Sequence, residues 1–254
     1  AIIAERWREG RVFLAGDAAH MTPPFAGQGL NSGFRDVTNL SWKLAAVVKG
    51  PASGDILDSY ELERKDHARA LIDTALQLGQ QIQPIHPQQA AERDAFFAEL
   101  NRDPGAMQAM EDEMFNSILD RSIDKGLVVD AGGIAGRLLI QPVLKTDAGN
   151  GVLLDEYLGD GFSIIGFDCD PQDVLGAEVL QQWLALDARV VTIARSDDTP
   201  QPRGLTDKLG EFGDWLGGDT ACVLLVRPAR FCMAAATPSK ADDQLGRARQ
   251  LLVA

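Results

Sequence analysis

The 254-residue chain is poor in the residues that build metal and disulfide sites. It has three cysteines and three histidines, and no two cysteines stand in a CxxC pair. Structural zinc sites and disulfide frameworks need closely spaced clusters of such residues, so the sequence indicates neither. Three well-separated thiols suit a reducing compartment, and a cytoplasmic location is therefore expected.

Long apolar runs and an excess of positive charge are also missing. No stretch approaches the roughly 20 apolar residues that a membrane helix needs, and no signal peptide is recognisable. The 24 Lys and Arg residues are outnumbered by 37 Asp and Glu residues, which gives a net charge of −13. A chain this acidic is expected to bind neither nucleic acid nor an anionic membrane.

The remaining composition is that of a folded protein. Hydrophobic residues make up 45% of the chain, enough for one large or two small packed domains. Helical spacing of apolar residues and flanking Pro and Gly signals predict a mainly helical first part, residues 1–135. Its helices are expected over residues 27–49, 56–83, 88–100 and 104–120.

The pattern changes after Gly132-Gly133. Residues 136–151 are expected to form an extended connector, and a β-α-β-α-β-β-α order is expected beyond it. The predicted strands are 162–167, 189–194, 221–227 and 231–236. The predicted helices are 173–187, 205–216 and 240–253. The sequence thus indicates an α/β (α+β) protein with a second domain over residues 136–254.

Residues 11–44 combine several features of a ligand site. A short apolar strand at 11–15 ends in a turn of small residues with one carboxylate, Asp17. Such a carboxylate can accept hydrogen bonds from the hydroxyl groups of a sugar or polyol. Gly27 and Gly29 then lead into a helix whose free N–H groups favour negative charge. Together these features suit a cofactor with a polyol and a ring that becomes anionic.

Each feature also has a purely structural explanation. Asp17 could cap the turn that follows it, and Gly27 and Gly29 could serve a tight turn without any ligand. Pro23-Pro24 could form only a stiff connector. His20, which looks exposed, is more simply a packing or hydrogen-bonding residue than a catalyst. Spacing alone leaves both sets of explanations open.

In combination, these residues resemble the second FAD motif of the class A flavoprotein aromatic hydroxylases. The similar segments are RVFLAGDAAH at 11–20, PPFAGQGLNSG at 23–33, DVTNLSWKL at 36–44 and YELER at 60–64. Within the family, the sequence looks most like the 3-(3-hydroxyphenyl)propionate hydroxylases. Residues 136–254 are similar to the thioredoxin-like C-terminal domain of the phenol hydroxylase branch. The resemblance implies the C-terminal part of an FAD-binding monooxygenase domain followed by a thioredoxin-like domain.

The resemblance also implies a role for each matching residue. Asp17 would bind a hydroxyl group of the FAD ribityl chain, and Pro23 and Pro24 would lie near the isoalloxazine ring. The predicted cofactor-binding set is completed by Gly27, Gly29, Leu30 and Asn31. The N–H groups of the last three would face the N1–C2=O edge of the ring, where the helix dipole would stabilise an anionic flavin.

The family's chemistry is carried by FAD rather than by one catalytic side chain, and none is singled out here. NADH or NADPH reduces the flavin, and oxygen then forms a C4a-hydroperoxide that hydroxylates a phenolic ring. The resemblance thus implies a monooxygenase with a small aromatic substrate such as 3-(3-hydroxyphenyl)propionate and with molecular oxygen as cosubstrate. A homodimer is the family's expected assembly.

Two parts of the family pattern are absent from the sequence. There is no G-x-G-x-x-G motif to hold the ADP pyrophosphate and no central Asp-Gly segment. The chain begins with Ala1 rather than Met. It is therefore expected to be a C-terminal portion that is inactive alone. The apolar faces of residues 30–48 and 56–82 are expected to lack their partners and to favour association.

The thioredoxin-like part departs from a redox-active thioredoxin. Cys169 follows its first strand, but no second cysteine comes two residues later. The neighbouring carboxylates of Asp168 and Asp170 are expected to raise the pKa of the Cys169 thiol. A scaffold or subunit-contact role is therefore favoured over disulfide exchange.

Two other functions are compatible with the sequence. The same flavoprotein fold also supports halogenases, epoxidases and reductases, because a fold does not determine a function. The chain could also be a non-catalytic thioredoxin-like interaction module with a helical arm. That alternative predicts that Asp17, Gly27 and Gly29 can be replaced without loss of function.

Overall fold

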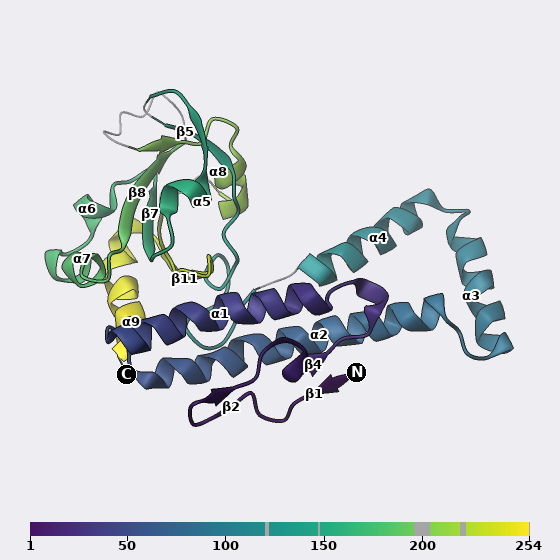
Figure 1. Cartoon of the computed structure of the whole chain (residues 1–254). Coiled ribbons are helices and arrows are strands. Elements are labelled where there is room, and N and C mark those ends of the chain that lie inside the picture. The colour runs from purple at the N-terminus through teal and green to yellow at the C-terminus, as the bar shows by residue number, and fades with distance from the viewer. Residues whose placement is uncertain (120–121, 147, 196–203, 219–221, 254) are drawn as a thin grey trace. The chain divides into compact units, whose positions relative to one another are not determined.

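Figure 1 shows the computed structural model of the chain. The structure describes residues 1–119, 122–146, 148–195, 204–218 and 222–253. No helix within these ranges is long and apolar enough to cross a membrane.

The chain divides into two compact units, each with most of its residue contacts inside itself. The first consists of Ala1–Ser41 and Tyr60–Arg121, and the second of Trp42–Ser59 and Ser122–Ala254. This division by contacts does not test the predicted domain boundary between residues 135 and 136, which stays a prediction.

The first unit is dominated by helices, as predicted. α1 (Gly29–Lys49) begins in it, and α2 (Ser59–Ile82), α3 (Pro87–Leu100) and α4 (Pro104–Leu119) follow. The Oδ1 of Asp103 accepts hydrogen bonds from the first N–H groups of α4, and this N-cap explains where α4 starts.

The strands of the first unit are only two residues long. They are β1 (Ile2–Ile3), β2 (Arg8–Glu9), β3 (Val12–Phe13) and β4 (His20–Met21). β1 pairs with β4, and β2 pairs with β3, both antiparallel. The prediction of a buried strand over 11–15 was wrong. β3 has only two residues and belongs to a two-stranded ribbon, in which Val12 is exposed and Phe13 is half-buried.

The second unit is built on a mixed sheet with the strand order β11-β10-β7-β8-β9-β5-β6 in its described residues. These strands are β5 (Val143–Thr146), β6 (Gly151–Leu153), β7 (Ser163–Phe167), β8 (Arg189–Ala194), β9 (Leu205–Thr206), β10 (Cys222–Val226) and β11 (Cys232–Ala236). β7 and β8 are parallel, whereas β10 is antiparallel to both β7 and β11. All five residues of β7 are buried, as expected for a central strand covered on both faces.

In the described residues, four helices lie in the connections of this sheet and a fifth follows its last strand. They are α5 (Leu154–Leu158), α6 (Pro171–Val174), α7 (Ala177–Leu184), α8 (Glu211–Leu216) and α9 (Ala241–Val253). The core order β7-α7-β8-α8-β10-β11-α9 is the predicted β-α-β-α-β-β-α arrangement (Figure 1). The α/β fold class with a thioredoxin-like C-terminal part is therefore confirmed.

Three predicted elements of the second unit were wrong in extent. The connector predicted over 136–151 contains β5, which forms a hairpin with β6 and buries Leu144 completely. The helix predicted over 205–216 starts only at Glu211, because Leu205–Thr206 join the sheet between β8 and β5. The helix predicted over 173–187 is divided into α6 and α7 at Gly176, the residue that precedes α7.

Candidate functional site

The turn that carries Asp17 is packed directly against α1. This turn, η1 (Gly16–Ala18), follows β3, and Gly16 has a left-handed backbone with φ of 58°. A Cβ atom on Gly33 of α1 would lie 3.4 Å from the Cα of Gly16, so the two backbones are almost in contact. Glycine is favoured at 16 by its left-handed conformation, whereas a Cβ there would be in ordinary contact with Gly33, 3.7 Å from its Cα.

Asp17 itself lies on the surface of this turn. Its side chain is exposed and makes no hydrogen bond or ion pair with the described residues. The capping role considered from the sequence is therefore not seen. The carboxylate is available to accept hydrogen bonds from a ligand.

The start of α1 is equally open. Before it, η2 (Pro24–Ala26) ends at Gly27, whose φ is 62°. The first backbone hydrogen bond of the helix runs from the Ser32 N–H to the Gln28 carbonyl, at 2.8 Å. The N–H groups of Gly29, Leu30 and Asn31 therefore have no partner within the helix. A Cβ on Gly27 or Gly29 would meet no atom within 4 Å, so a ligand can approach the backbone.

All seven residues predicted to bind the cofactor thus lie at the surface of one segment. Asp17, Pro24, Gly27, Leu30 and Asn31 are exposed, and Pro23 and Gly29 are half-buried. Their arrangement offers an acceptor for hydroxyl groups and a set of free N–H donors at a positive helix end. These groups fit one edge of a flavin with its polyol chain.

A buried ion-pair cluster, which we call the Asp36 cluster, holds this segment in place. Asp36 of α1 is completely buried. Its Oδ2 accepts a hydrogen bond from the Gly16 N–H at 3.0 Å and lies 2.7 Å from the His20 Nε2. Its Oδ1 accepts a hydrogen bond from the Arg64 Nε at 2.9 Å. One carboxylate therefore joins the Asp17 turn, α1 and α2.

The environment of Asp36 favours its charged form. Burial alone would raise its pKa, but the hydrogen bond with His20, the charge of Arg64 and the Gly16 N–H hold the pKa below its usual value. Burial and the nearby Asp36 carboxylate raise the pKa of Tyr60. The cluster is thus a buried carboxylate balanced by a guanidinium, with Tyr60 neutral beside it.

The residues around the cluster attach the N-terminal segment to α2. The Trp7 ring is fully buried and stacks on His20, with the ring centroids 5.3 Å apart. The Tyr60 hydroxyl donates to the Leu14 carbonyl at 2.9 Å, and the Glu61 carboxylate accepts from the Trp7 N–H at 2.8 Å. The YELER sequence, which had no assigned role, thus supplies contacts from Tyr60, Glu61 and Arg64.

The Asp36 cluster was not predicted from the sequence. His20 has the packing and hydrogen-bonding role expected for it, but the prediction that it is exposed was wrong. Only 2% of His20 is exposed, because Trp7 and Asp36 enclose it. One signal was available in the sequence. Arg64 lies in the otherwise apolar stripe of α2, and a charge in such a stripe needs a buried partner.

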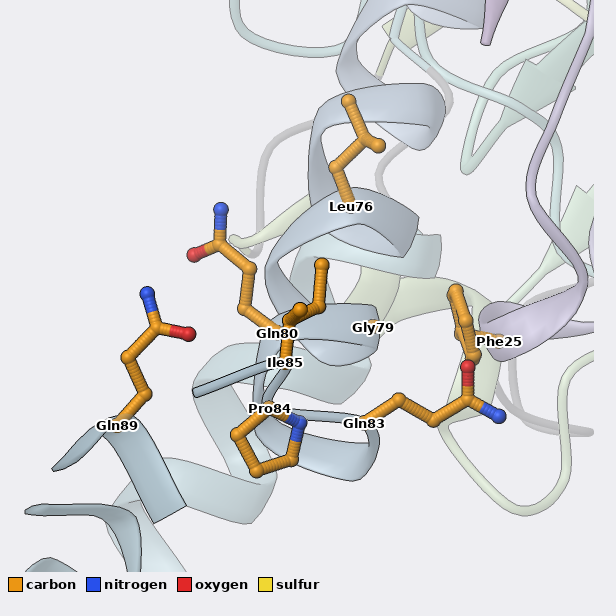
Figure 2. A pocket seen from close by; sticks show the side chains of 8 residues that line it. All are labelled: Phe25, Leu76, Gly79, Gln80, Gln83, Pro84, Ile85 and Gln89. Atoms are coloured by element: carbon orange, nitrogen blue, oxygen red, sulfur yellow. The ribbon is translucent and has the colours of Figure 1, made fainter. Parts of the chain in front are cut away.

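A pocket of about 570 Å³ lies next to the same segment (Figure 2). Phe25 of η2 forms one wall, and the end of α2 and the start of α3 form the others. None of the described residues that line it is charged. The lining residues are Phe25, Leu76, Gly79, Gln80, Gln83, Pro84, Ile85 and Gln89.

The thiols of the second unit are poorly suited to redox chemistry. Burial, together with Asp168 and Asp170, raises the pKa of Cys169 to about 11, in the predicted direction. Burial raises the pKa of Cys222 to about 12. Thiols with such pKa values are protonated near neutral pH and are weak nucleophiles.

Comparison with known proteins identifies relatives of both parts of the chain. The FAD binding domain family matches residues 1–75, and the HcaD C-terminal domain family matches residues 136–251. The chain is 38% identical to a 3-(3-hydroxy-phenyl)propionate/3-hydroxycinnamic acid hydroxylase of Klebsiella pneumoniae (strain 342). This match covers 96% of the chain and 46% of the relative. The 3-(3-hydroxy-phenyl)propionate/3-hydroxycinnamic acid hydroxylase 2 of Burkholderia vietnamiensis is also 38% identical, over 91% of the chain and 45% of that protein.

Solved structures give the same result. OxyS anhydrotetracycline hydroxylase from Streptomyces rimosus has a TM-score of 0.74 and 30% identity, covering 98% of this chain and 46% of that one. A ternary complex of aklavinone-11 hydroxylase with FAD and aklavinone has a TM-score of 0.73 and 28% identity, covering 98% of this chain and 45% of that one. The chain therefore spans somewhat less than half the length of these relatives, and the resemblance seen in the sequence is confirmed.

Proposed function

By sequence and fold, the chain is a member of the class A flavoprotein aromatic hydroxylases. We therefore propose that it forms the C-terminal portion of an FAD-dependent aromatic monooxygenase. One observation carries the proposal. The exposed carboxylate of Asp17 lies in a turn that packs against Gly33 of α1, and the buried Asp36 cluster holds this turn on the same helix whose N-terminus is open. This pairing of a hydroxyl acceptor with free N–H donors suits a flavin.

Each residue then has a defined task toward the cofactor. Asp17 accepts hydrogen bonds from the polyol hydroxyl groups. The N–H groups of Gly29, Leu30 and Asn31, at the positive end of the 21-residue helix α1, stabilise negative charge on the ring. Pro23 and Pro24 give the adjoining wall a stiff backbone. When bound, FAD supplies the redox and oxygen chemistry, and the protein supplies position and local charge.

The relatives suggest the other participants in the reaction. We infer a phenolic substrate of the 3-(3-hydroxyphenyl)propionate type, molecular oxygen as cosubstrate, and NADH or NADPH as the reductant. A homodimer and a cytoplasmic location are part of the same proposal. The described cysteines are all free thiols, which agrees with a reducing compartment.

The first experiment is a visible absorbance spectrum before and after addition of FAD, followed by gel filtration. We expect the present chain to retain no flavin, because it has no G-x-G-x-x-G turn for the pyrophosphate. The full-length polypeptide should retain FAD and oxidise NADH or NADPH in the presence of 3-(3-hydroxyphenyl)propionate. A full-length protein that retains no flavin would overturn the proposal.

The role of Asp17 is tested in the same full-length protein. Loss of one hydrogen bond to a buried ligand costs about 1–2 kcal/mol, so Asp17→Ala should weaken FAD binding about tenfold. Asp73→Ala on α2 is the matched control, because Asp73 is also exposed and makes no hydrogen bond or ion pair with described residues. Equal FAD affinity of the two variants would show that Asp17 does not bind the cofactor and would contradict the role proposed for it.

A further inference from the structure

We propose that Gly79 of α2 is a positioning residue for the flavin-contacting turn, because it has no side chain and so lets the Phe25 ring pack against the helix backbone. We call this packing contact the seat of Phe25. The inference depends on the proposed flavin site, since Phe25 lies between Pro24 and Gly27, two of the residues assigned to it. Gly79 would thus act on the cofactor through Phe25 and without touching it.

The contact between these two residues is unusually close. A Cβ atom on Gly79 would lie 2.5 Å from the Cε2 and 2.6 Å from the Cδ2 of Phe25. Carbon atoms in contact are normally about 3.5–4.0 Å apart, so only glycine leaves room for the ring. Figure 2 shows Phe25 beside the helix at this position.

The position of this glycine in its helix supports a specific role. Gly79 is the one glycine in the 24 residues of α2 and lies three residues before its end. Glycine weakens a helix relative to alanine, so it needs a compensating reason at an internal position. The Phe25 ring supplies that reason, because the ring packs against bare helix backbone there.

Phe25 also joins the turn to α2 through its contact with Gly79. The hydrogen bonds from the Gly27 N–H to the Pro24 carbonyl and from Gln28 to the Ala26 carbonyl stay within the turn. The Arg35 Nη2 donates to the Gln28 Oε1 at 3.2 Å, which connects the turn to α1. Without the contact between Phe25 and Gly79, the exposed backbone at Pro24 and Gly27 loses this attachment to α2.

The pocket beside Phe25 determines what a larger residue at 79 would do. Phe25 and Gly79 both line this space of about 570 Å³, so a displaced ring has room to move into it. Gly79→Ala should therefore release the ring from its seat and leave the helix intact. The turn would lose its anchor in a protein that still folds.

The experiment uses the full-length polypeptide with Gly79→Ala, Phe25→Ala and the double variant. Gly79→Ala and Phe25→Ala should each weaken FAD binding about tenfold, and the double variant should be no weaker than either one, because both remove the same contact. Gly246→Ala is the matched control, since its Cβ within α9 would meet only Val179, at 3.8 Å. FAD affinity is measured by fluorescence titration.

A second measurement without FAD separates this inference from the proposed function. Amide hydrogen exchange at residues 25–29 should be faster in Gly79→Ala and Phe25→Ala than in the parent and Gly246→Ala. Unchanged exchange and FAD affinity in Gly79→Ala, or additive losses in the double variant, would overturn the inference. A parent protein that binds no FAD would overturn the proposed flavin site, while faster exchange would still support the seat.

Discussion

At the scale of single residues, the most consequential group is the carboxylate of Asp36. It is fully buried and serves three donors that come from three segments of the chain. A buried ion pair adds little net stability compared with an apolar replacement, but removing one partner leaves an uncompensated charge. The cluster therefore specifies how the segments meet, and it is sensitive to any change in charge.

We expect Asp36→Asn to destabilise the first unit by about 3 kcal/mol, because Arg64 would be left buried without its carboxylate. The effect should depend on pH. The folded-state pKa of Asp36 is lowered from 3.8, so its contribution is fully present above that value and is lost as the pH falls through the folded pKa. Urea unfolding between pH 3 and pH 7 should show a loss of stability in acid that is smaller in the variant.

Asp73→Asn is the control for this experiment, since the exposed Asp73 should change stability by less than about 0.5 kcal/mol. Parallel acid profiles for the parent and Asp36→Asn would mean that the pKa of Asp36 is the same in the folded and the unfolded protein. That outcome would contradict the interpretation that charge interactions of Asp36 stabilise the folded protein.

At the scale of helices and strands, the sequence predicted those elements that depend on the local pattern of residues. α1, α2, α3 and α4 follow from apolar spacing and from Gly, Pro and Asp signals at their ends. β9 could not be predicted in this way. The local pattern assigns its two residues, Leu205 and Thr206, to the start of a helix. In the structure they form a strand because they pair with β5, about 60 residues earlier in the chain.

The candidate site shows the same division between local and long-range information. Asp17, Gly27 and Gly29 stand out because a dense local motif contains them. The Asp36 cluster joins residues that are 16 and 28 positions apart. The seat of Phe25 on Gly79 likewise depends on how α2 packs, which spacing along the chain does not reveal.

A prediction at this scale concerns the central strand β7. A Cβ atom on Gly166 would lie 2.2 Å from the Cys169 carbonyl oxygen and 2.7 Å from the Cδ of Pro171, because the chain folds back over the strand there. We expect Gly166→Ala to destabilise the second unit by about 3 kcal/mol, since neither backbone has room to move. Thermal unfolding measures this.

Gly246→Ala again provides the comparison, because it adds the same methyl group where space allows it. It should leave the unfolding temperature unchanged or raise it slightly, as alanine favours a helix. A loss below about 1 kcal/mol for Gly166→Ala would show that the loop after β7 can shift at little cost.

At the scale of the whole molecule, the chain presents apolar surface that its fold does not cover. Leu30, Phe34 and Val37 of α1 are 74%, 62% and 55% exposed. Their spacing of four and three residues places them on one face of the helix. The uncovered apolar face that the sequence predicted over residues 56–82 was wrong, because Tyr60, Leu71 and Ala75 of that face are buried against the rest of the first unit. The sequence also predicted an uncovered apolar face over residues 30–48, which the structure confirms. Contiguous patches of this kind normally lie against another part of a protein, and the relatives contain more than half their length outside the matched region.

We therefore expect the chain alone to self-associate through this face of α1. Sedimentation velocity should show a mean mass that rises with protein concentration, because association of apolar faces is driven by burial of their surface. Phe34→Glu combined with Val37→Glu should reduce this dependence. Leu209→Glu is the control, since Leu209 is 72% exposed but lies in the other unit. A chain that stays monomeric at all concentrations would show that the α1 face does not drive association. Equal effects of the α1 substitutions and of Leu209→Glu would instead point to non-specific aggregation.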